Sequence, residues 1–295
     1  MSPPRLPGLP RLFVFGWGGV GAALGRRLKA EGWAVSATAR SEGAAAALAA
    51  EGVQDVDVAD PGALAAAAGA ADAVLVTAPP DDGGCPGLAA LAPALRAGEA
   101  RPWIGYLSTT GVYGDHGGRW VFEQTPTAPQ SAEAHRRVAA ETAWSALAAE
   151  TGATLAIFRL PGLYGPGRSA LDRVRAGDAR RLVRPGQVFS RLHLGDAATA
   201  IATAIARPRA GAVFNLCDDL PAPSADVTAH AARLLGLPVP PEEPVDLSTL
   251  SVPARRFWSE NKRVSNALAK AELGWRPAFP TYREGLAAIL AAQGR

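Results

Sequence analysis

The sequence predicts an α/β protein with a doubly wound parallel sheet and a smaller second lobe. Short apolar runs alternate with Ala-rich helical stretches from Arg11 to Arg159, and the first run leads into a glycine-rich turn. The chain has 295 residues, of which 48% are apolar and 19% charged, a composition typical of globular proteins. That length suits a main domain with a smaller attachment.

The first predicted strand, RLFVF at 11–15, has the continuous apolar pattern of a strand buried on both faces. It runs into GWGGVG and then a helix-favouring stretch, with the spacing Gly16-x-Gly18-x-x-Gly21. In a dinucleotide site, Gly16 permits the tight turn, Gly18 lets a pyrophosphate approach the backbone, and Gly21 lets the helix pack on the strand. The N-terminus of the helix then faces the phosphates.

The second predicted strand, WAVSATAR, ends at Arg40, where a dinucleotide site places the residue that meets the adenosine ribose. An acidic residue there favours NAD, whereas Arg40 followed by Ser41 favours the 2′-phosphate of NADP. The alternative is that Arg40 only ends the strand in solvent. We therefore expect NADP as the cofactor, with NAD as the alternative.

The alternation continues through further helices and strands, which predicts a parallel sheet covered on both faces. The expected elements are a helix in SEGAAAALAAEG, a strand at 53–56, a helix in PGALAAAAG, a strand in DAVLVTAPP, a helix at 88–97 and a strand in PWIGYLSTT.

Ligands of such a sheet lie beyond the carboxyl ends of the strands. This rule selects Asp57, the segment Thr77, Ala78 and Pro79, and the segment 108–110. Asp57 is expected at the adenine edge, and its alternative role is to cap the next helix.

Composition and spacing exclude several classes of protein. The net charge of +3 comes from scattered arginines without a basic block, so no nucleic acid is expected as a partner. No segment has the roughly 18 uncharged apolar residues of a membrane span, so we expect no membrane association. Cys85 and Cys217 lie far apart, which favours neither a disulfide nor a metal site and indicates a reducing, cytoplasmic location. The N-terminal 25 residues lack a convincing signal-peptide cleavage site and are expected to belong to the fold.

Five stretches together resemble one known family. YLSTTGVYGD at 106–115 is similar to the strand-end signature of extended short-chain dehydrogenases/reductases, the NAD(P)-dependent epimerase/dehydratase group. Four others agree in order and spacing: FRLPGLYGPGR at 158–168, RLHLGDAATAIATAI at 191–205, AVFNLCDDLPAP at 212–223 and NKRVSNALAKAELGWRPAFPTYREGL at 261–286.

The resemblance implies a dinucleotide-binding Rossmann domain over residues 1–165. It implies a mostly substrate-binding α/β lobe over 166–295, with segments around 191–217 returning to the first domain. Leu160 is expected to lie near the nicotinamide end. The family also has a catalytic Ser or Thr and a Tyr-x-x-x-Lys pair on the helix that follows.

The chain departs from the family at that pair. Alignment with the family pattern places Thr109 at the Ser/Thr position, Glu133 at the tyrosine and Arg137 at the lysine. No tyrosine occurs in residues 114–163 and no lysine in residues 30–261, so a small shift of the alignment does not restore the pair. The chain therefore resembles the atypical branch of the family, which keeps the fold but loses the usual catalytic residues.

A glutamate does different chemistry from a tyrosine. Near its usual pKa of about 4.3, Glu133 is ionised at neutral pH, and Arg137 on the same helical face lowers that pKa further. Glu133 is thus either a base, a proton donor if burial raises its pKa, or one half of an i,i+4 ion pair without a catalytic role. Arg137 is a candidate donor to the nicotinamide ribose, and the Thr109 hydroxyl a candidate to orient a substrate oxygen.

The sequence contains three further groups of candidate residues. Tyr113 is a candidate substitute acid but more often structural in the family. His193 and Asp196 are expected to be structural at the start of a helix. Arg256, Trp258 and Asn261 lie in the region of the C-terminal lobe where the family meets the phosphates or sugars of its substrates.

The sequence hypothesis is an NADP-preferring oxidoreductase that acts by hydride transfer on a small molecule, nucleotide-like or sugar-like. The alternative is a non-catalytic, regulatory or redox-sensing protein that binds a dinucleotide. We expect a monomer or homodimer, with no metal.

Overall fold

The structure is a computed structural model that describes residues 9–294, apart from the side chain of Pro253. The expectation that the N-terminus belongs to the fold lies, for the first eight residues, outside the described part. The chain forms two compact units that interleave in sequence. The first unit extends to Ser108 and adds 139–158 and 201–213, and the second comprises 109–138, 159–200 and 214–295. The sequence-based division at residue 165 stays a proposal.

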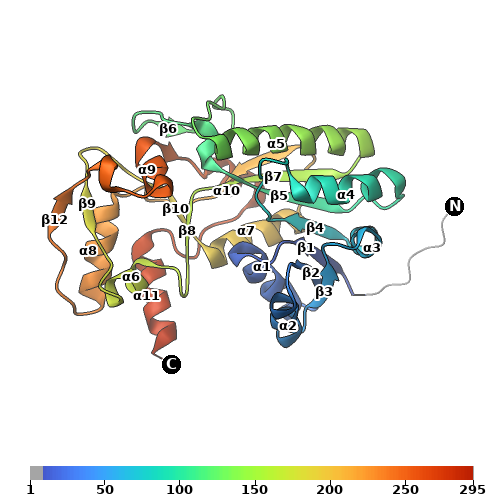
Figure 1. Ribbon diagram of the computed structural model, residues 1–295, viewed down its shortest axis with the longest axis horizontal. Helices are drawn as coiled ribbons and strands as arrows, with labels where there is room; N and C mark the ends of the chain where they lie inside the picture. Colours follow the sequence, from blue (N-terminus) through green and yellow to red (C-terminus); the bar gives the residue numbers. More distant parts are fainter. Residues whose placement is uncertain (1–8, 295) are drawn as a thin grey trace. The chain divides into compact units, whose positions relative to one another are not determined.

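The central sheet has seven strands in the order β11-β7-β5-β4-β1-β2-β3 (Figure 1). The pairs β1–β2, β2–β3, β1–β4 and β4–β5 are parallel. Chain order reverses at β1, the arrangement of a doubly wound sheet whose ligands lie where β1 and β4 diverge. The predicted fold class is therefore confirmed. The strands are β1 (Arg11–Phe15), β2 (Ala34–Ala39), β3 (Gln54–Asp57), β4 (Ala73–Val76), β5 (Trp103–Thr109), β7 (Thr154–Leu160) and β11 (Ala212–Asn215).

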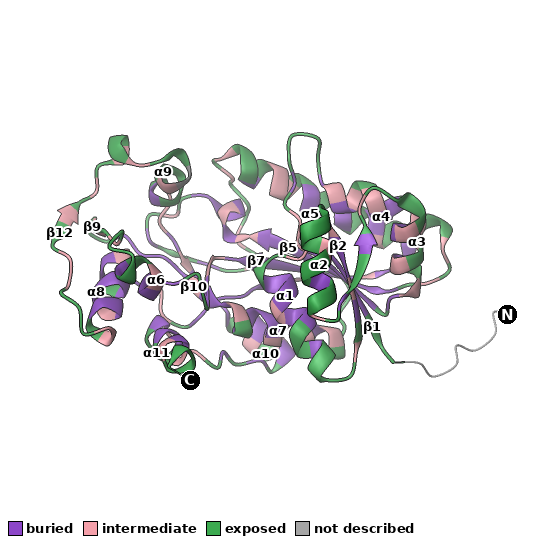
Figure 2. Cartoon of the chain, turned by 60° about the horizontal axis from the view of Figure 1, so that its bottom comes forward, coloured by how far each residue is buried: buried purple, intermediate pink, exposed green. Residues whose placement is uncertain are grey.

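Helices cover the strands of the first unit. Figure 1 shows α4 and α5 on one side of these strands and α1 and α2 on the other. On the α4 and α5 side, Phe13, Leu91 and Trp144 belong to one buried apolar cluster, and Figure 2 shows the central strands largely as buried residues. The helices are α1 (Gly19–Ala30), α2 (Glu42–Ala50), α3 (Pro61–Ala70), α4 (Pro86–Ala97), α5 (Ala132–Thr151) and α7 (Leu194–Ala206).

The second unit consists of short elements. Three parallel two-stranded sheets, β8–β10, β9–β12 and β6–β13, join segments far apart in sequence. Its elements are η1 (Thr110–Tyr113), β6 (Trp120–Val121), β8 (Gly162–Tyr164), α6 (Ala170–Arg175), β9 (Arg181–Val183), β10 (Arg191–His193), α8 (Ser224–Leu234), β12 (Glu242–Pro244), η2 (Leu247–Thr249), α9 (Val252–Ser259), β13 (Arg263–Val264), α10 (Ala267–Leu273) and α11 (Tyr282–Gln293).

The apolar core of the second unit lies between α6, α8 and α11, where Leu171, Val227 and Leu286 are buried together. His193 and Asp196, at the start of α7, make hydrogen bonds within this unit, and the recorded partners of Asp196 lie outside that helix. The His193 Nδ1 accepts a hydrogen bond from the Gly195 N–H at 3.1 Å, and burial lowers the pKa of the imidazole. The Asp196 carboxylate accepts the N–H groups of Ala278 and Phe279, at 2.7 and 3.1 Å. No helix within residues 9–294 is long and apolar enough to cross a membrane.

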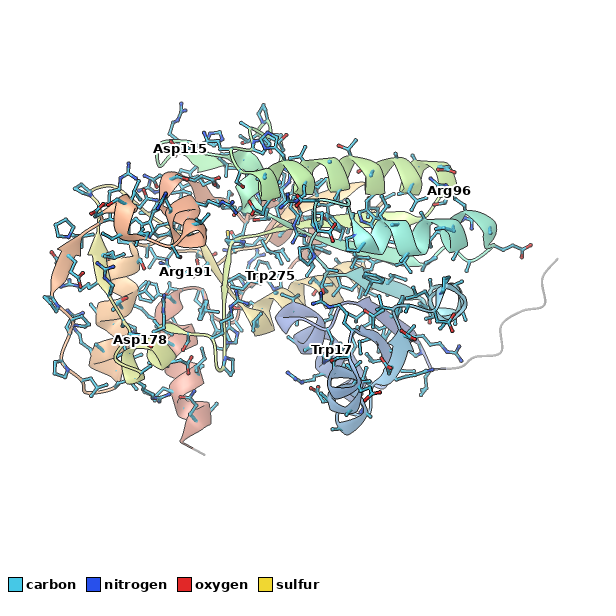
Figure 3. All side chains as sticks on the ribbon, viewed as in Figure 1. Trp17, Arg96, Asp115, Asp178, Arg191 and Trp275 are labelled. Atoms are coloured by element: carbon cyan, nitrogen blue, oxygen red, sulfur yellow. The ribbon has the colours of Figure 1, made fainter. Side chains whose placement is uncertain are left out.

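A buried carboxyl group makes this unit sensitive to pH. Asp218 is 2% exposed, and burial raises its pKa from 3.8 to about 7, although the positive charge of Arg191 opposes that shift. One carboxylate oxygen accepts the Leu220 N–H at 3.3 Å, and the other has no hydrogen-bond partner among the described residues. Figure 3 labels Arg191, whose own pKa burial lowers to about 10.

We predict that the Asp218→Asn variant becomes more stable relative to the wild type as the pH rises from 5 to 8. The unfolded Asp218 ionises near pH 4 and the folded one near pH 7, so wild-type stability falls as pH rises between these values. The difference in the free energy of unfolding between variant and wild type should change by about 2 kcal/mol from pH 5 to pH 8. Urea denaturation followed by tryptophan fluorescence measures it. A difference independent of pH would show that Asp218 is already ionised at pH 5.

Candidate functional site

The glycine turn after β1 is held by two threonines. The Gly16 N–H donates to the Thr38 hydroxyl at 2.8 Å, and the Thr77 hydroxyl donates to the Gly16 carbonyl at 2.6 Å. Gly16 has a φ of +97°, and a Cβ at this position would lie 2.7 Å from the Thr77 oxygen. The turn therefore requires glycine on both conformational and steric grounds.

The other two glycines differ in what surrounds them. A Cβ on Gly21 would lie 2.9 Å from both the Gly16 carbonyl oxygen and a methyl group of Val14, so this position permits the close packing of α1 on β1. A Cβ on Gly18 would meet nothing closer than the Thr77 hydroxyl at 3.9 Å. The backbone at Gly18 is thus open to the approach of a ligand.

The N-terminus of α1 fits a pyrophosphate. Gly18 is the N-cap, no side chain accepts the first N–H groups, and the first turn holds no acidic residue. An anion there would receive the free N–H groups and interact favourably with the helix dipole. The residues present therefore fit the diphosphate of a dinucleotide.

Arg40 follows the last residue of β2 and is exposed. Its guanidinium has no ion-pair or hydrogen-bond partner recorded within residues 9–294, whereas the neighbouring Ser41 accepts the Ala44 N–H and caps α2. An unpaired guanidinium at this strand end fits a phosphate on the adenosine ribose. Whether Arg40 and Ser41 bind the cofactor stays a prediction.

The remaining residues predicted to contact the cofactor lie at the end of β3 and directly after β4. Asp57 accepts the Ala59 N–H at 2.8 Å, and the N-cap of α3 is Asp60. The alternative role of Asp57 as that helix cap is therefore wrong, because the cap lies three residues later. After β4, the backbone N–H groups of Thr77 and Ala78 donate to the Phe15 carbonyl, at 3.0 and 3.3 Å. The Thr77, Ala78 and Pro79 segment thus borders the glycine turn.

The second unit contains a cavity of about 310 Å³ beside Thr109, which we call the Thr109 cavity. Thr109 accepts the Gly111 N–H at 3.1 Å and caps η1. Phe257 lines the wall and stacks on Phe189, with ring centroids 4.1 Å apart and planes 8° apart. The complete lining is Thr109, Thr110, Gly111, Pro161, Gly162, Val188, Phe189, Ser190, Arg256, Phe257, Glu260, Lys262 and Val264.

Glu133 and Arg137 are not among the residues that line this cavity. Glu133 is half-exposed and contacts the Arg256 guanidinium closely, with Arg136 at 3.9 Å. A hydrogen bond from its own backbone N–H, together with Arg256, lowers the pKa of the Glu133 carboxyl. An ionised, solvent-exposed carboxylate is a poor proton donor.

Tyr113 is fully buried in a polar network and not in the cavity lining. Its hydroxyl donates to Asn215 at 2.8 Å and accepts from Arg159 at 3.0 Å. The carboxylate of Glu123 accepts the Asn215 backbone N–H at 2.8 Å. Burial raises the pKa of Tyr113, so the tyrosine keeps its proton and supports the segment that follows Thr109. Leu160, the predicted nicotinamide neighbour, is buried at the end of β7.

Lys262 lines the cavity and is 9% exposed, although no motif in the sequence marked it as a site residue. Glu260, which pairs with Lys262, was not predicted either. The only sequence signal was the scarcity of lysine, since Lys262 is one of three. Among residues 9–294, no group of three or more His, Cys, Asp or Glu side chains is arranged to hold a metal ion.

The chain belongs to the family described as NAD(P)H-binding, which matches residues 16–203. A 3-diazoavenalumate denitrifying reductase from a Streptomyces species is 34% identical over 142 residues. That alignment covers 44% of this chain and 45% of the relative, so less than half of the relative's length is matched.

Solved structures agree with this family. A functionally unknown conserved protein from Silicibacter pomeroyi is 43% identical, with a TM-score of 0.88 over 97% of this chain and 100% of that one. A putative NAD-dependent epimerase/dehydratase from Methylobacillus flagellatus is 26% identical, with a TM-score of 0.70 over 98% and 100%. A dTDP-glucose 4,6-dehydratase from Bacillus anthracis, in complex with NAD, shares the fold at 17% identity, with a TM-score of 0.77 over 97% of each chain. The expected membership of the NAD(P)-binding, epimerase/dehydratase-like family is confirmed.

We predict that Gly18→Ala and Gly21→Ala affect different properties. Gly21→Ala should lower the free energy of unfolding by about 1–3 kcal/mol, because the new methyl group overlaps Val14 and the Gly16 carbonyl. Gly18→Ala should change stability by no more than about 1 kcal/mol, because Gly18 has an ordinary φ of −85°. It should nevertheless weaken NADPH binding at least about tenfold, since the methyl group blocks the diphosphate.

Thermal unfolding and fluorescence titration with NADPH measure these two effects. Equal NADPH affinity in wild type and Gly18→Ala would contradict the assignment of the glycine turn.

Proposed function

We propose that the protein is an oxidoreductase that prefers NADPH and transfers hydride to a small-molecule substrate. The observation that carries this proposal is the glycine turn, where the backbone at Gly18 is open and α1 begins without a side-chain cap. The bound dinucleotide would supply the hydride. The Streptomyces relative is named as a reductase, which supports the same class of reaction.

The preference for NADPH rests on Arg40. Its unpaired guanidinium follows β2, and charge-assisted hydrogen bonds from Arg to phosphate are among the stronger polar interactions in proteins. A carboxylate at this position would instead repel a 2′-phosphate. Ser41 is occupied as the cap of α2, so the discrimination falls on Arg40.

The Thr109 cavity supports a small substrate with an apolar body and a polar end. Val188, Phe189 and Phe257 line it with apolar surface, while Thr109 and Arg256 offer hydrogen-bond donors. This lining suits a carbonyl compound, and Arg256 also suits the phosphate of a nucleotide-like or sugar-like substrate. Cys85 and Cys217 are free and buried, which supports our proposal that the reaction takes place in the cytoplasm.

A non-catalytic, regulatory function is the second candidate. The exposed ion pair of Glu133 with Arg256, at the position where the family keeps its tyrosine, favours it. Turnover of NADPH with any member of a panel of carbonyl compounds and nucleotide sugars would exclude this function.

We predict that the protein binds NADPH at least about tenfold more tightly than NADH, and that Arg40→Ala abolishes this preference. The loss should fall on NADPH alone and amount to about 1.5–3 kcal/mol, the value of a hydrogen bond to a charged group. Fluorescence titration of each dinucleotide measures it.

Arg27→Ala is a matched control, because Arg27 is an exposed arginine of the same unit that pairs with Glu31. If neither dinucleotide gave a saturable fluorescence signal, the proposed function would be refuted. An unchanged preference in Arg40→Ala would refute only the role of Arg40.

We further predict that Glu133→Gln lowers kcat/KM less than about threefold, because exposed ion pairs contribute little. The substitution keeps the shape of the side chain and removes its charge. Steady-state kinetics with the best substrate of the panel measures the effect. A loss of about a hundredfold or more would instead identify Glu133 as an acid or base of the reaction.

A further inference from the structure

Lys262 is a buried lysine on the wall of the Thr109 cavity. The chain has only two other lysines, Lys29 and Lys270, and neither lines this cavity. Lysine is costly to bury unless its ammonium group finds partners, so its surroundings indicate what it does there.

The backbone on both sides of Lys262 is fixed by hydrogen bonds to a distant segment. The Asn261 N–H donates to the Asp115 carboxylate at 2.7 Å, and the Arg263 N–H donates to the Arg119 carbonyl at 2.9 Å. Figure 3 labels Asp115 in this segment. The parallel pairing of β6 with β13 continues the contact. Lys262 is therefore held in one position relative to the segment that follows Thr109.

The ammonium group has two partners and one remaining hydrogen. It donates to the Gly114 carbonyl at 2.7 Å and contacts the Glu260 carboxylate closely. A lysine ammonium has three N–H groups, and no third partner of Lys262 is recorded within the described part of the chain. One N–H of Lys262 thus has no recorded acceptor, and the residue lines the cavity.

Thr109 supplies a second donor to the same cavity. Its oxygen accepts the Gly111 N–H, so the hydroxyl hydrogen is directed elsewhere. No acceptor for that hydrogen is recorded among residues 9–294. A carbonyl oxygen has two lone pairs and can accept from both donors at once.

We propose that Lys262 is the proton donor of the reaction and does the work of the missing Tyr-x-x-x-Lys pair, with Thr109 orienting the substrate oxygen. This inference rests on the proposed reductase function. It assigns to the Thr109 cavity a carbonyl substrate whose oxygen lies between the Lys262 ammonium and the Thr109 hydroxyl. Glu260 positions the ammonium.

Bound NADPH would supply a hydride, with its electron pair, to the carbonyl carbon of the substrate, and the π electrons of the C=O bond would move to oxygen. The oxygen takes a proton from Nζ of Lys262 as that N–H bond breaks. The products are an alcohol, NADP⁺ and a neutral lysine, which regains its proton from solvent.

A purely structural Lys262 would behave differently. Arginine keeps the positive charge and can donate to Gly114 and Glu260, but it does not give up a proton in proteins. Lys262→Arg therefore separates the two roles. A structural lysine would be replaced with little loss, whereas a proton donor would not.

The experiment uses the full chain, NADPH and 4-nitrobenzaldehyde as the probe carbonyl, with wild type, Lys262→Arg, Lys262→Ala and Lys270→Met. Lys270 is the matched control, because it pairs with Asp219 away from the cavity. Both Lys262 variants should lose about a hundredfold or more in kcat/KM, the usual contribution of a general acid. They should keep wild-type affinity for NADPH, and Lys270→Met should keep its activity.

Ethylamine should restore the kcat of Lys262→Ala about tenfold or more by supplying an N–H donor, whereas tetramethylammonium, which has the charge without the N–H, should not.

Nearly full activity in Lys262→Arg would overturn the proposal, as would rescue of Lys262→Ala by tetramethylammonium as well as by ethylamine. If Lys262→Ala does not fold, Lys262→Arg alone decides. Failure of the wild type to reduce any carbonyl in the panel, despite binding NADPH, would instead refute the reductase function itself.

Discussion

The hydrogen bonds that join residues 115–121 to residues 261–265 determine which side chains meet in the Thr109 cavity. They bring Lys262 within 2.7 Å of the Gly114 carbonyl, across 148 residues of sequence. The buried contacts of Tyr113 with Arg159 and Asn215 support the same segment from the core of the unit. Without these two sets of contacts, the cavity would lose both its buried lysine and the fixed position of Thr109.

Hydrogen bonds also fix the glycine turn of the first unit. Thr38 in β2 and Thr77 after β4 hold Gly16 by two hydrogen bonds, so the conformation of the turn is fixed without a ligand. A site that is formed before its ligand arrives loses less conformational entropy on binding. Glycine suits the three positions for different reasons: backbone conformation at Gly16, ligand access at Gly18 and helix packing at Gly21. Only the reason at Gly18 concerns the ligand directly.

The sequence predicted the fold well because its signals are local. A buried apolar strand such as RLFVF, a glycine turn and a following helix are all encoded within a few residues. Lys262 escaped prediction because β6 and β13 have two residues each, too few for any periodicity, and their pairing is long-range. The contact of Glu133 with Arg256 was not predicted for the same reason. Arg256 lies 123 residues away on α9, whereas Arg137 is a neighbour of Glu133 on the same helix. The sequence predicts that the family's usual tyrosine and lysine are absent, but which side chains meet in the cavity depends on tertiary contacts.

We infer that this member of the NAD(P)-binding family transfers hydride to a carbonyl carbon. Transfer of deuterium from C4-deuterated NADPH to 4-nitrobenzaldehyde tests it most directly, with the alcohol product analysed by mass spectrometry. We expect one deuterium on the alcohol carbon from one stereoisomer of the labelled NADPH and none from the other. Binding of NADPH without any labelled alcohol from either stereoisomer would contradict it.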